Sequence, residues 1–183
     1  ESDGPGRRMF MDLGPLHLEA GGRLPSVTLA YETWGELNDA GDNAVLVLHA
    51  LTGDSHVTGD LEPGHATAGW WSDIVGPGKP IDTDRYFVVA PNVLGGCQGS
   101  TGPSSPAPDG TPWGSRFPYV TVRDQVAAEV ELADRLGIGA FALVVGASMG
   151  GHRALVWAAG YPSRVRRLAA IATTAQTSGD QIA

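Results

Sequence analysis

The chain has 183 residues, of which 42% are hydrophobic and 17% charged, so it is long enough for one globular domain with a proper core. Its net charge of −8 argues against a nucleic-acid or anionic-membrane surface, and no apolar run reaches the ~18 residues that span a bilayer. The single cysteine excludes an intramolecular disulfide and fits the reducing cytoplasm, and no Cys/His spacing suggests a metal site.

The start of the chain divides into a short polar segment and a folded region. Residues 1–8 are polar and rich in Gly and Pro, so we expect a disordered leader there, with residues 9–183 forming the N-terminal part of one domain. Residues 9–19 and 24–33 have the composition of two strands, and Gly21-Gly22 lies between them. The pattern predicts an antiparallel pair at the beginning of the fold.

Two short apolar runs follow, residues 44–48 (AVLVL) and 86–90 (YFVVA), and each predicts a strand buried on both faces. The segment 52–80 between them is rich in loop-forming residues, with a short helical turn expected at 70–73. Residues 91–118 form a long Gly/Pro/Ser-rich connection. Structureless loops of that length inside a compact domain are uncommon and usually functional.

A helix is predicted over residues 121–136. Thr121 at its start and Asp124 three residues on have the spacing of a capping box. Valines four residues apart form a stripe that we expect to face the sheet: Val122, Val126 and Val130.

The most informative stretch lies near the end of the chain. An apolar run, residues 141–145, is followed by Gly146-Ala147-Ser148-Met149-Gly150 and then by a predicted helix at 151–159. A further strand is expected at 165–172. Strands that alternate with helices in this way predict an α/β fold with a mostly parallel sheet.

The order strand, G-x-S-x-G, helix is the context of a nucleophile elbow. A serine on a sharp turn between strand and helix has a strained backbone, and side chains two positions away would collide with it. Gly146 and Gly150 remove that collision and leave the hydroxyl of Ser148 exposed near a helix N-terminus, where N–H groups favour negative charge. We therefore predict that Ser148 is a nucleophile; the alternative is an ordinary serine in a Gly-rich turn.

A serine nucleophile needs an oxyanion hole. On this scaffold one donor is the backbone N–H of the residue after the nucleophile, here Met149, and the other comes from the loop after an earlier central strand. His49-Ala50-Leu51 leaves the predicted strand 44–48 at the right place, so the Leu51 N–H is the second candidate. An ordinary loop at the end of a strand is the alternative interpretation.

A general base is missing from these residues. On this scaffold the catalytic residues come in the chain order Ser, then Asp, then His. After Ser148 the sequence contains one histidine, His152, and one aspartate, Asp180. His152 lies four residues on in the same helix, so its side chain leans along the helix instead of reaching over the turn. His49 could line the site but stands in the wrong order to be the base. We therefore expect the chain to be the N-terminal part of a longer protein.

Several long segments together resemble a known family, the homoserine O-acetyltransferases, in the form that actinobacteria have. The resemblance runs from about residue 12 to 183 and is carried by LVLHALTGDSHVTG (46–59), GWWSDIVGPGKPIDTDRYFVVAPNVLGGCQGSTGPSS (69–105), WGSRFPYVTVRDQV (113–126) and VVGASMGGHRALVWAAGYPSRV (144–165).

The resemblance implies an α/β-hydrolase fold with a mostly parallel central sheet, truncated before a helical lid and the C-terminal strands. It implies a ping-pong reaction of methionine biosynthesis, in which Ser148 takes an acetyl group from acetyl-CoA and passes it to the hydroxyl of L-homoserine, with Leu51 and Met149 forming the oxyanion hole. Acetyl-CoA is then a co-substrate, and no cofactor or metal is expected to be bound. The triad Asp and His would lie outside this chain, either further along the same polypeptide or on a second chain, and the full-length protein would be a homodimer in the cytoplasm.

A narrow, closed site is what favours transfer over hydrolysis, and the loop 91–118 is expected to form one wall of it. Asn92 and Arg116 in this loop are the candidate substrate-binding residues, near the Gly95-Gly96 turn. A solvated surface charge is an equally good interpretation of Arg116. Alternative functions stay open: acetyl transfer to serine or an antibiotic precursor, succinyl-CoA as the donor, a serine esterase, or an inactive fragment.

Overall fold

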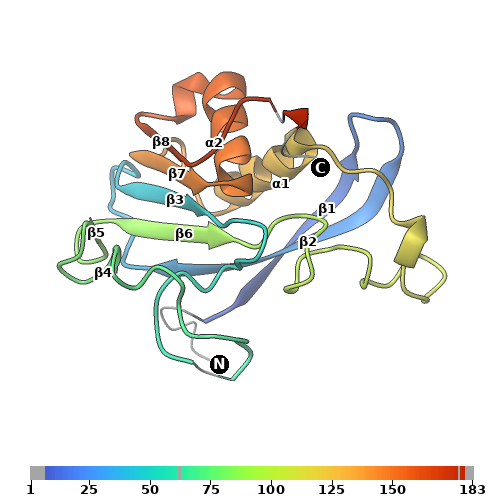
Figure 1. Cartoon of the computed structure of the whole chain (residues 1–183), viewed down its shortest axis with the longest axis horizontal. Coiled ribbons are helices and arrows are strands. Elements are labelled where there is room, and N and C mark those ends of the chain that lie inside the picture. The colour runs from blue at the N-terminus through green and yellow to red at the C-terminus, as the bar shows by residue number, and fades with distance from the viewer. Residues whose placement is uncertain (1–6, 62, 177, 180–183) are drawn as a thin grey trace.

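A computed structural model describes residues 7–61, 63–176 and 178–179; most of the expected leader, residues 1–6, lies outside the described residues. The centre of the molecule is a six-stranded sheet in the order β1-β2-β6-β3-β7-β8 (Figure 1). The strands are β1 (Met9–His17), β2 (Arg23–Trp34), β3 (Ala44–Leu48), β6 (Phe87–Pro91), β7 (Leu143–Ala147) and β8 (Leu168–Ile171).

The sheet joins an antiparallel hairpin to a parallel block. β1 pairs antiparallel with β2, and β2 pairs antiparallel with β6. From β6 onward all pairs are parallel, β6 with β3, β3 with β7 and β7 with β8. The predicted opening hairpin and the mostly parallel sheet are both confirmed. All five residues of β3, at the centre of the parallel block, are buried as their apolar run predicts.

Two helices, α1 (Val122–Arg135) and α2 (Met149–Gly160), lie on the same side of the sheet (Figure 1). The larger hydrophobic core fills the space between them and the sheet and includes Leu132, Phe141 and Trp157. The ring of Trp157 meets that of Phe141 edge to face, with centroids 5.4 Å apart. None of the helices in the described part of the chain has the length and apolar character that crossing a membrane requires.

The opposite face of the sheet is covered by loops and by a small second sheet. β4 (Val75–Gly76) pairs parallel with β5 (Ile81–Asp82), and both were too short to be predicted. A second core cluster, with Trp34, Val57 and Val88 among its members, packs beneath this region. Short 3₁₀ helices occur at η1 (Gly114–Arg116) and η2 (Pro162–Arg164).

The capping box at the start of α1 is confirmed. The Thr121 hydroxyl accepts from the Asp124 N–H at 3.2 Å, and the Asp124 carboxylate accepts from the Thr121 N–H at 2.8 Å. The predicted valine stripe is only partly right, because Val126 is fully buried while Val122 and Val130 are half-buried. The reason is that α1 packs against α2 and the β1–β2 hairpin, which turns other residues inward.

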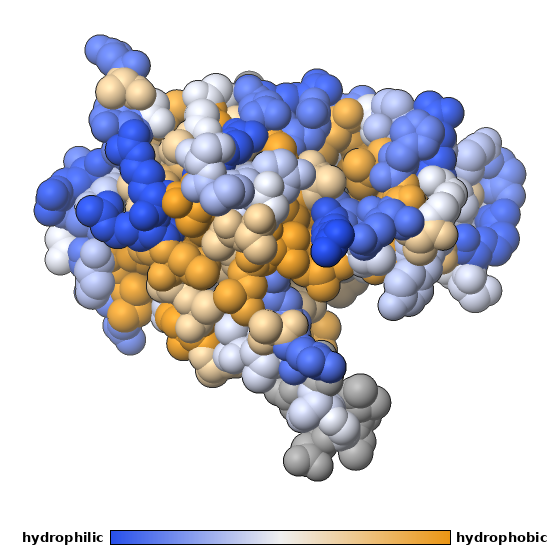
Figure 2. Space-filling model, turned by 90° about the horizontal axis from the view of Figure 1, so that it is seen from above, coloured by the Kyte–Doolittle hydropathy of each residue, from blue (hydrophilic) through white to orange (hydrophobic). Residues whose placement is uncertain are grey.

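The surface on the side of α2 and β8 shows hydrophobic residues gathered in its middle, with polar residues around them (Figure 2). β8 forms the end of the described sheet, and its Leu168 and Ile171 are among the exposed large hydrophobic residues. The two side chains are 39% and 43% exposed, respectively.

Candidate active site

Ser148 stands on the turn between β7 and α2, and its backbone is strained. Its φ of 51° and ψ of −120° lie where residues other than glycine are rarely found. Such a conformation costs about 1–3 kcal/mol and persists only where the surroundings impose it. Here the Ser148 N–H donates to the Ile171 carbonyl at 3.0 Å, and its own carbonyl accepts from the Thr173 hydroxyl at 2.9 Å. The serine is exposed, as a nucleophile elbow requires.

The two glycines that flank Ser148 have no room for a side chain. A Cβ at Gly146 would overlap the carbonyl of Gly150, and a Cβ at Gly150 would overlap the Leu48 carbonyl at the end of β3. The expectation that these glycines relieve a collision is therefore met in the structure. The turn that carries Ser148 is packed directly against the end of the central strand.

A cleft of about 650 Å³ opens beside the turn, and both predicted oxyanion-hole residues line it. Met149 is the first residue of α2, where the backbone N–H has no partner within the helix. Leu51 follows β3, and its side chain is 77% exposed. Within the described residues, neither the Leu51 N–H nor the Met149 N–H donates a hydrogen bond to the protein. The cleft thus presents two free N–H donors beside an exposed serine.

The other walls of the cleft come from three segments. They are the end of β3, the loop after β6 and the stretch that leads into α1: His49, Gly53, 92–98, 103–104, 117–120 and Gln125. Part of the predicted wall 91–118 is therefore present. Cys97, the single cysteine, is exposed in this wall.

His49 is buried at the end of β3 and both of its ring nitrogens are engaged. Nε2 accepts from the Val93 N–H at 3.0 Å, and Nδ1 lies 2.7 Å from the Ala50 carbonyl. Burial, together with the nearby charge of Arg153, lowers the pKa of His49 from 6.5 to about 4. The ring is therefore neutral near pH 7, and it has no free nitrogen with which to act as a base.

Arg153 on α2 is fully buried and joins three elements. Its guanidinium pairs with Glu129 of α1 and donates to the His49 carbonyl at 2.9 Å. Glu129 also accepts from the indole N–H of Trp157 at 2.8 Å. The buried charges are thus paired and hydrogen-bonded, which a low-dielectric interior requires. The network fixes α1, α2 and the loop after β3 relative to one another.

Asn92, a predicted substrate-binding residue, lines the cleft but is 2% exposed. Its side-chain oxygen accepts from the Ser55 N–H at 2.8 Å, and its amide donates to the Ser55 hydroxyl at 3.1 Å and the Gln98 carbonyl at 2.6 Å. The protein itself uses all of these groups. Asn92 therefore holds the cleft wall together.

Arg116, the other predicted substrate-binding residue, is not among the residues that line the cleft, although its neighbour Phe117 is. Its guanidinium pairs with the Asp109 carboxylate at 2.7 Å and donates to the Thr111 hydroxyl at 2.6 Å. Hydrogen bonds from Arg116 and Thr111 hold the pKa of Asp109 below its ordinary value. Both partners of the pair are about half exposed, so they form a surface pair within one loop.

His152 lines a different cavity, of about 460 Å³, together with Thr121 and Arg123. Within the described residues, Ser148 makes no side-chain hydrogen bond. The structure therefore places Leu51 and Met149 on one cleft, with Ser148 next to Met149 in the chain, and within the described residues no histidine hydrogen-bonds to the serine side chain.

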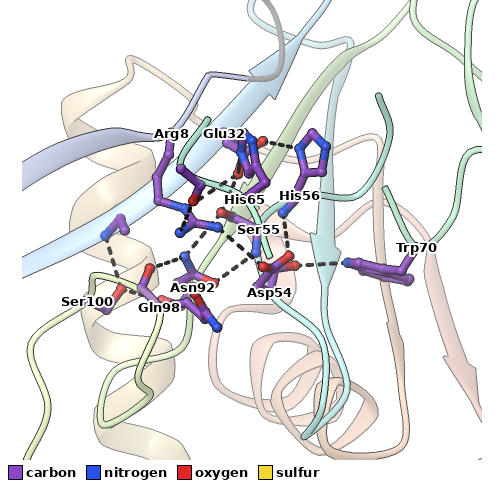
Figure 3. Close-up of polar contacts among 12 residues, drawn as sticks. Arg8, Glu32, Asp54, Ser55, His56, His65, Trp70, Asn92, Gln98 and Ser100 are labelled. Atoms are coloured by element: carbon purple, nitrogen blue, oxygen red, sulfur yellow. Dashed lines mark hydrogen bonds and ion pairs between the residues drawn. The ribbon is translucent and has the colours of Figure 1, made fainter. Parts of the chain in front are cut away.

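A buried polar cluster that sequence reasoning missed lies around Glu32 of β2 (Figure 3). The carboxylate accepts from the Ser55 hydroxyl at 2.6 Å and lies 2.9 Å from His56 Nδ1 and 3.1 Å from His65 Nε2. The two imidazoles stack with centroids 3.7 Å apart. Arg8 adds a positive charge, with its Nε 3.7 Å from Glu32.

This Glu32 cluster also has the ligand spacing of a metal site, because one atom each of Glu32, His56 and His65 lies within 4.8 Å of the other two. Its hydrogen bonds favour another assignment. His56 Nδ1 faces Glu32 at 2.9 Å, and its Nε2 faces the Asp60 carbonyl at 3.0 Å, so both ring nitrogens already have partners within the protein. Arg8 also compensates the negative charge of the Glu32 carboxylate. The cluster therefore fits a buried network of hydrogen bonds and ion pairs better than a cation site.

Comparison with known proteins identifies the fold family of the chain. Residues 43–182 match the model of the alpha/beta hydrolase fold family, and the chain belongs to that family. The matched residues include the turn at Ser148 and the parallel strands β3, β6, β7 and β8.

Within the family, the chain is a homologue of homoserine O-acetyltransferases, and the resemblance found in the sequence is confirmed. It is 65% identical to the homoserine O-acetyltransferase of Thermobifida fusca, over 100% of this chain and 48% of the relative. The solved homoserine O-acetyltransferase of Bacillus anthracis superimposes with a TM-score of 0.88 at 33% identity, covering 94% of this chain and 49% of that chain. Esterase E22 superimposes with a TM-score of 0.81 at 36% identity, covering 87% and 45%. The chain spans about half the length of the curated relatives it matches.

Proposed function

We propose that this chain is the nucleophile-bearing portion of a homoserine O-acetyltransferase that uses acetyl-CoA as donor and L-homoserine as acceptor. The observation that carries the proposal is an exposed, strained Ser148 directly before Met149, on a turn beside the cleft that Met149 and Leu51 line with their unpaired N–H groups. The 65% identity with the Thermobifida fusca enzyme supports the choice of donor and acceptor.

In the proposed reaction, the Ser148 oxygen attacks the thioester carbonyl of acetyl-CoA. The tetrahedral oxyanion is held by the N–H groups of Leu51 and Met149, and the thiolate of CoA leaves and takes up a proton. The homoserine hydroxyl then attacks the acetyl-serine ester through a second tetrahedral oxyanion, giving O-acetylhomoserine and free Ser148. Because an oxyanion-hole donor contributes roughly 10²–10³ in rate, the two N–H groups supply a large part of the stabilisation.

The proton of Ser148 needs a base in this scheme. His49 has both nitrogens engaged and His152 lines another cavity. We therefore propose that the base is a histidine, oriented by an aspartate, and that both lie outside these 183 residues. The expected homodimer of the whole protein belongs to the same proposal.

The two expected substrate-binding residues would have different roles. Asn92 would shape the wall through its bonds to Ser55 and Gln98. Arg116 would reach a substrate only after releasing Asp109.

Hydrolysis of an acetyl ester is the second candidate, because esterase E22 is 36% identical over 87% of this chain. The elbow and the free N–H groups serve both reactions equally. What separates the two is the partner that discharges the acetyl-serine, homoserine or water.

The test uses the complete protein, meaning the longest product of the reading frame that contains this sequence. Mixing it with acetyl-CoA should release CoA and raise the protein mass by one acetyl group, and Ser148→Ala should abolish both. Homoserine should then discharge the acetyl group at least about tenfold faster than water or serine does. Discharge by water at the same rate would favour the esterase, and acylation of the Ser148→Ala variant would refute the nucleophile. Succinyl-CoA in place of acetyl-CoA tests the donor.

A further inference from the structure

The peptide that carries the Leu51 N–H is held by a side chain. The carbonyl of that peptide belongs to Ala50, and it lies 2.7 Å from His49 Nδ1. A trans peptide is planar, with its C=O and N–H pointing in opposite directions, and no cis peptide occurs in the described chain. Fixing the Ala50 carbonyl toward the His49 ring therefore turns the Leu51 N–H away from the ring.

The other nitrogen of the ring decides which nitrogen carries the proton. The Val93 N–H donates to Nε2 at 3.0 Å, so Nε2 must be unprotonated. In a neutral imidazole the proton then lies on Nδ1, and the Nδ1–H donates a hydrogen bond to the Ala50 carbonyl. Burial favours this neutral form. The Val93 amide thus selects the tautomer that orients the Leu51 peptide.

A second bond holds the preceding peptide. Arg153 donates to the His49 carbonyl at 2.9 Å, and it lies on α2, the helix whose first N–H belongs to Met149. The Gly53 N–H adds a further bond to the Ala50 carbonyl, at 3.0 Å. Two successive peptides at the end of β3 are therefore fixed relative to the helix that carries the other N–H donor.

We propose that His49 is a positioning residue for the oxyanion hole. Its Nδ1–H holds the Ala50 carbonyl, and this contact directs the Leu51 N–H into the cleft. This inference rests on the proposed function, because it assigns a role within the same site. It differs from a merely structural role, in which His49 would only tie Val93 and its loop to β3.

The two nitrogens can be separated by substitution. In His49→Asn, an amide N–H can stand near the position of Nδ1 and donate to Ala50, while the Val93 bond is lost. In His49→Gln, a longer side chain can place its oxygen near the position of Nε2 and accept from Val93, while the donor to Ala50 is lost. Each variant removes one buried hydrogen bond, so the two form a matched pair.

The experiment measures the acylation burst of the complete protein with p-nitrophenyl acetate, together with the Tm of each variant. The wild-type protein must first show a burst that Ser148→Ala removes. If the wild-type protein shows no burst, the proposed function is refuted and not this inference. Given that burst, His49→Gln should lower the acylation rate constant by roughly 10- to 100-fold, with little change in the concentration of ester that gives half-saturation. His49→Asn should retain a rate within about fivefold of wild type, although both variants lower Tm to a similar extent.

The opposite order of the two variants would overturn the proposal. If His49→Gln acylates as fast as His49→Asn or faster, the bond to Val93 is the one that matters. If both rates fall equally and in proportion to the loss of Tm, His49 has only a structural role.

Discussion

At the scale of single residues, the nucleophile turn combines strain with the absence of side chains. Ser148 has a φ of 51°, and this backbone fits only because Gly146 and Gly150 leave space on both sides. The Leu48 carbonyl of β3 occupies the position where a Cβ of Gly150 would lie. The strain of the turn is therefore sustained by contact with the central strand.

Substituting Gly150 by alanine should lower the free energy of unfolding by about 3 kcal/mol, because the added Cβ overlaps backbone that cannot move freely. Chemical denaturation of the complete protein measures this effect. Gly139→Ala is the matched control, since nothing lies within 4 Å of its Cβ position and its φ is not positive. That variant should be unchanged or more stable by up to about 1 kcal/mol. Equal stabilities for the two variants would contradict the steric account.

His49 should make the stability of the protein depend on pH in a definite window. Its pKa falls from 6.5 in the ordinary state to about 4 in the fold, so the folded protein favours the neutral ring. The stability that His49 contributes is fully present above pH 6.5 and is lost as the pH falls toward 4. The free energy of unfolding falls by about 3 kcal/mol in total over this window. Unfolding free energies of the wild type and His49→Asn, measured at pH 7 and pH 4.5, should converge at the lower pH. Parallel curves for the two proteins would count against this assignment.

At the scale of elements, α1 and α2 meet through charged side chains inside an otherwise apolar contact. Glu129 of α1 accepts from both Arg153 and Trp157 of α2. At the beginning of α1, Asp124 caps the helix and also accepts from the Glu19 N–H at 2.8 Å. The helix is therefore held to the β1–β2 hairpin and to α2 by separate polar contacts.

Removing the cap of α1 by Thr121→Ala should cost about 1 kcal/mol, because the Asp124 N–H loses its acceptor. Thr121→Ser keeps the hydroxyl, so its free energy of unfolding should remain within roughly a few tenths of a kcal/mol of the wild-type value. Urea denaturation with an unchanged m-value is the appropriate measurement. A serine variant as unstable as the alanine variant would show that packing of the methyl group, and not the cap, is responsible.

At the scale of the whole molecule, the Glu32 cluster joins segments that are far apart in the sequence. Arg8 at the beginning of β1, Glu32 in β2, and His56 and His65 in the loop after β3 meet in one buried place (Figure 3). Ser55 connects this cluster to Asn92 and so to the wall of the cleft. The face of the sheet opposite the helices is therefore organised around one carboxylate.

Glu32→Gln should lower the free energy of unfolding by about 3–5 kcal/mol, because a neutral amide cannot replace a buried carboxylate that accepts from Ser55 and faces His56, His65 and Arg8. The exposed Glu36 offers a control nearby, and Glu36→Gln should stay within about 0.5 kcal/mol of wild type. Thermal unfolding compares the two variants. A Glu32→Gln protein as stable as the control would mean that the cluster carries no net charge interaction.

The sequence predicted the parts of the molecule that depend on local pattern. The run 44–48 became β3 with the same bounds, and the capping box at Thr121 and the elbow at Ser148 were found where expected. The bounds around the elbow moved, since β7 begins at Leu143 and α2 already begins at Met149. β7 begins at the residue that pairs with Val45 of β3, and no local pattern contains this pairing.

The polar networks could not be predicted, because each depends on contacts between distant residues. Glu32 is a single carboxylate within a strand of buried residues, and that was the one signal of a buried charge. Its partners come from a loop more than 20 residues away, so neither their identity nor their geometry follows from the pattern. His49 could be placed at the site, but its tautomer depends on Val93, which lies 44 residues further on.

The position of β3 has a consequence for how the chain is made. β3 lies between β6 and β7, and both of these strands follow it in the sequence. At a synthesis rate of about 5–20 residues per second, the roughly 100 residues from β3 to the end of β7 take on the order of 5–20 seconds to emerge. Throughout that interval a five-residue strand of Ala, Val and Leu has at least one edge without its native partner. Among the strands that the structure describes, β3 is therefore the one that a chaperone or another nascent chain can reach for longest during translation.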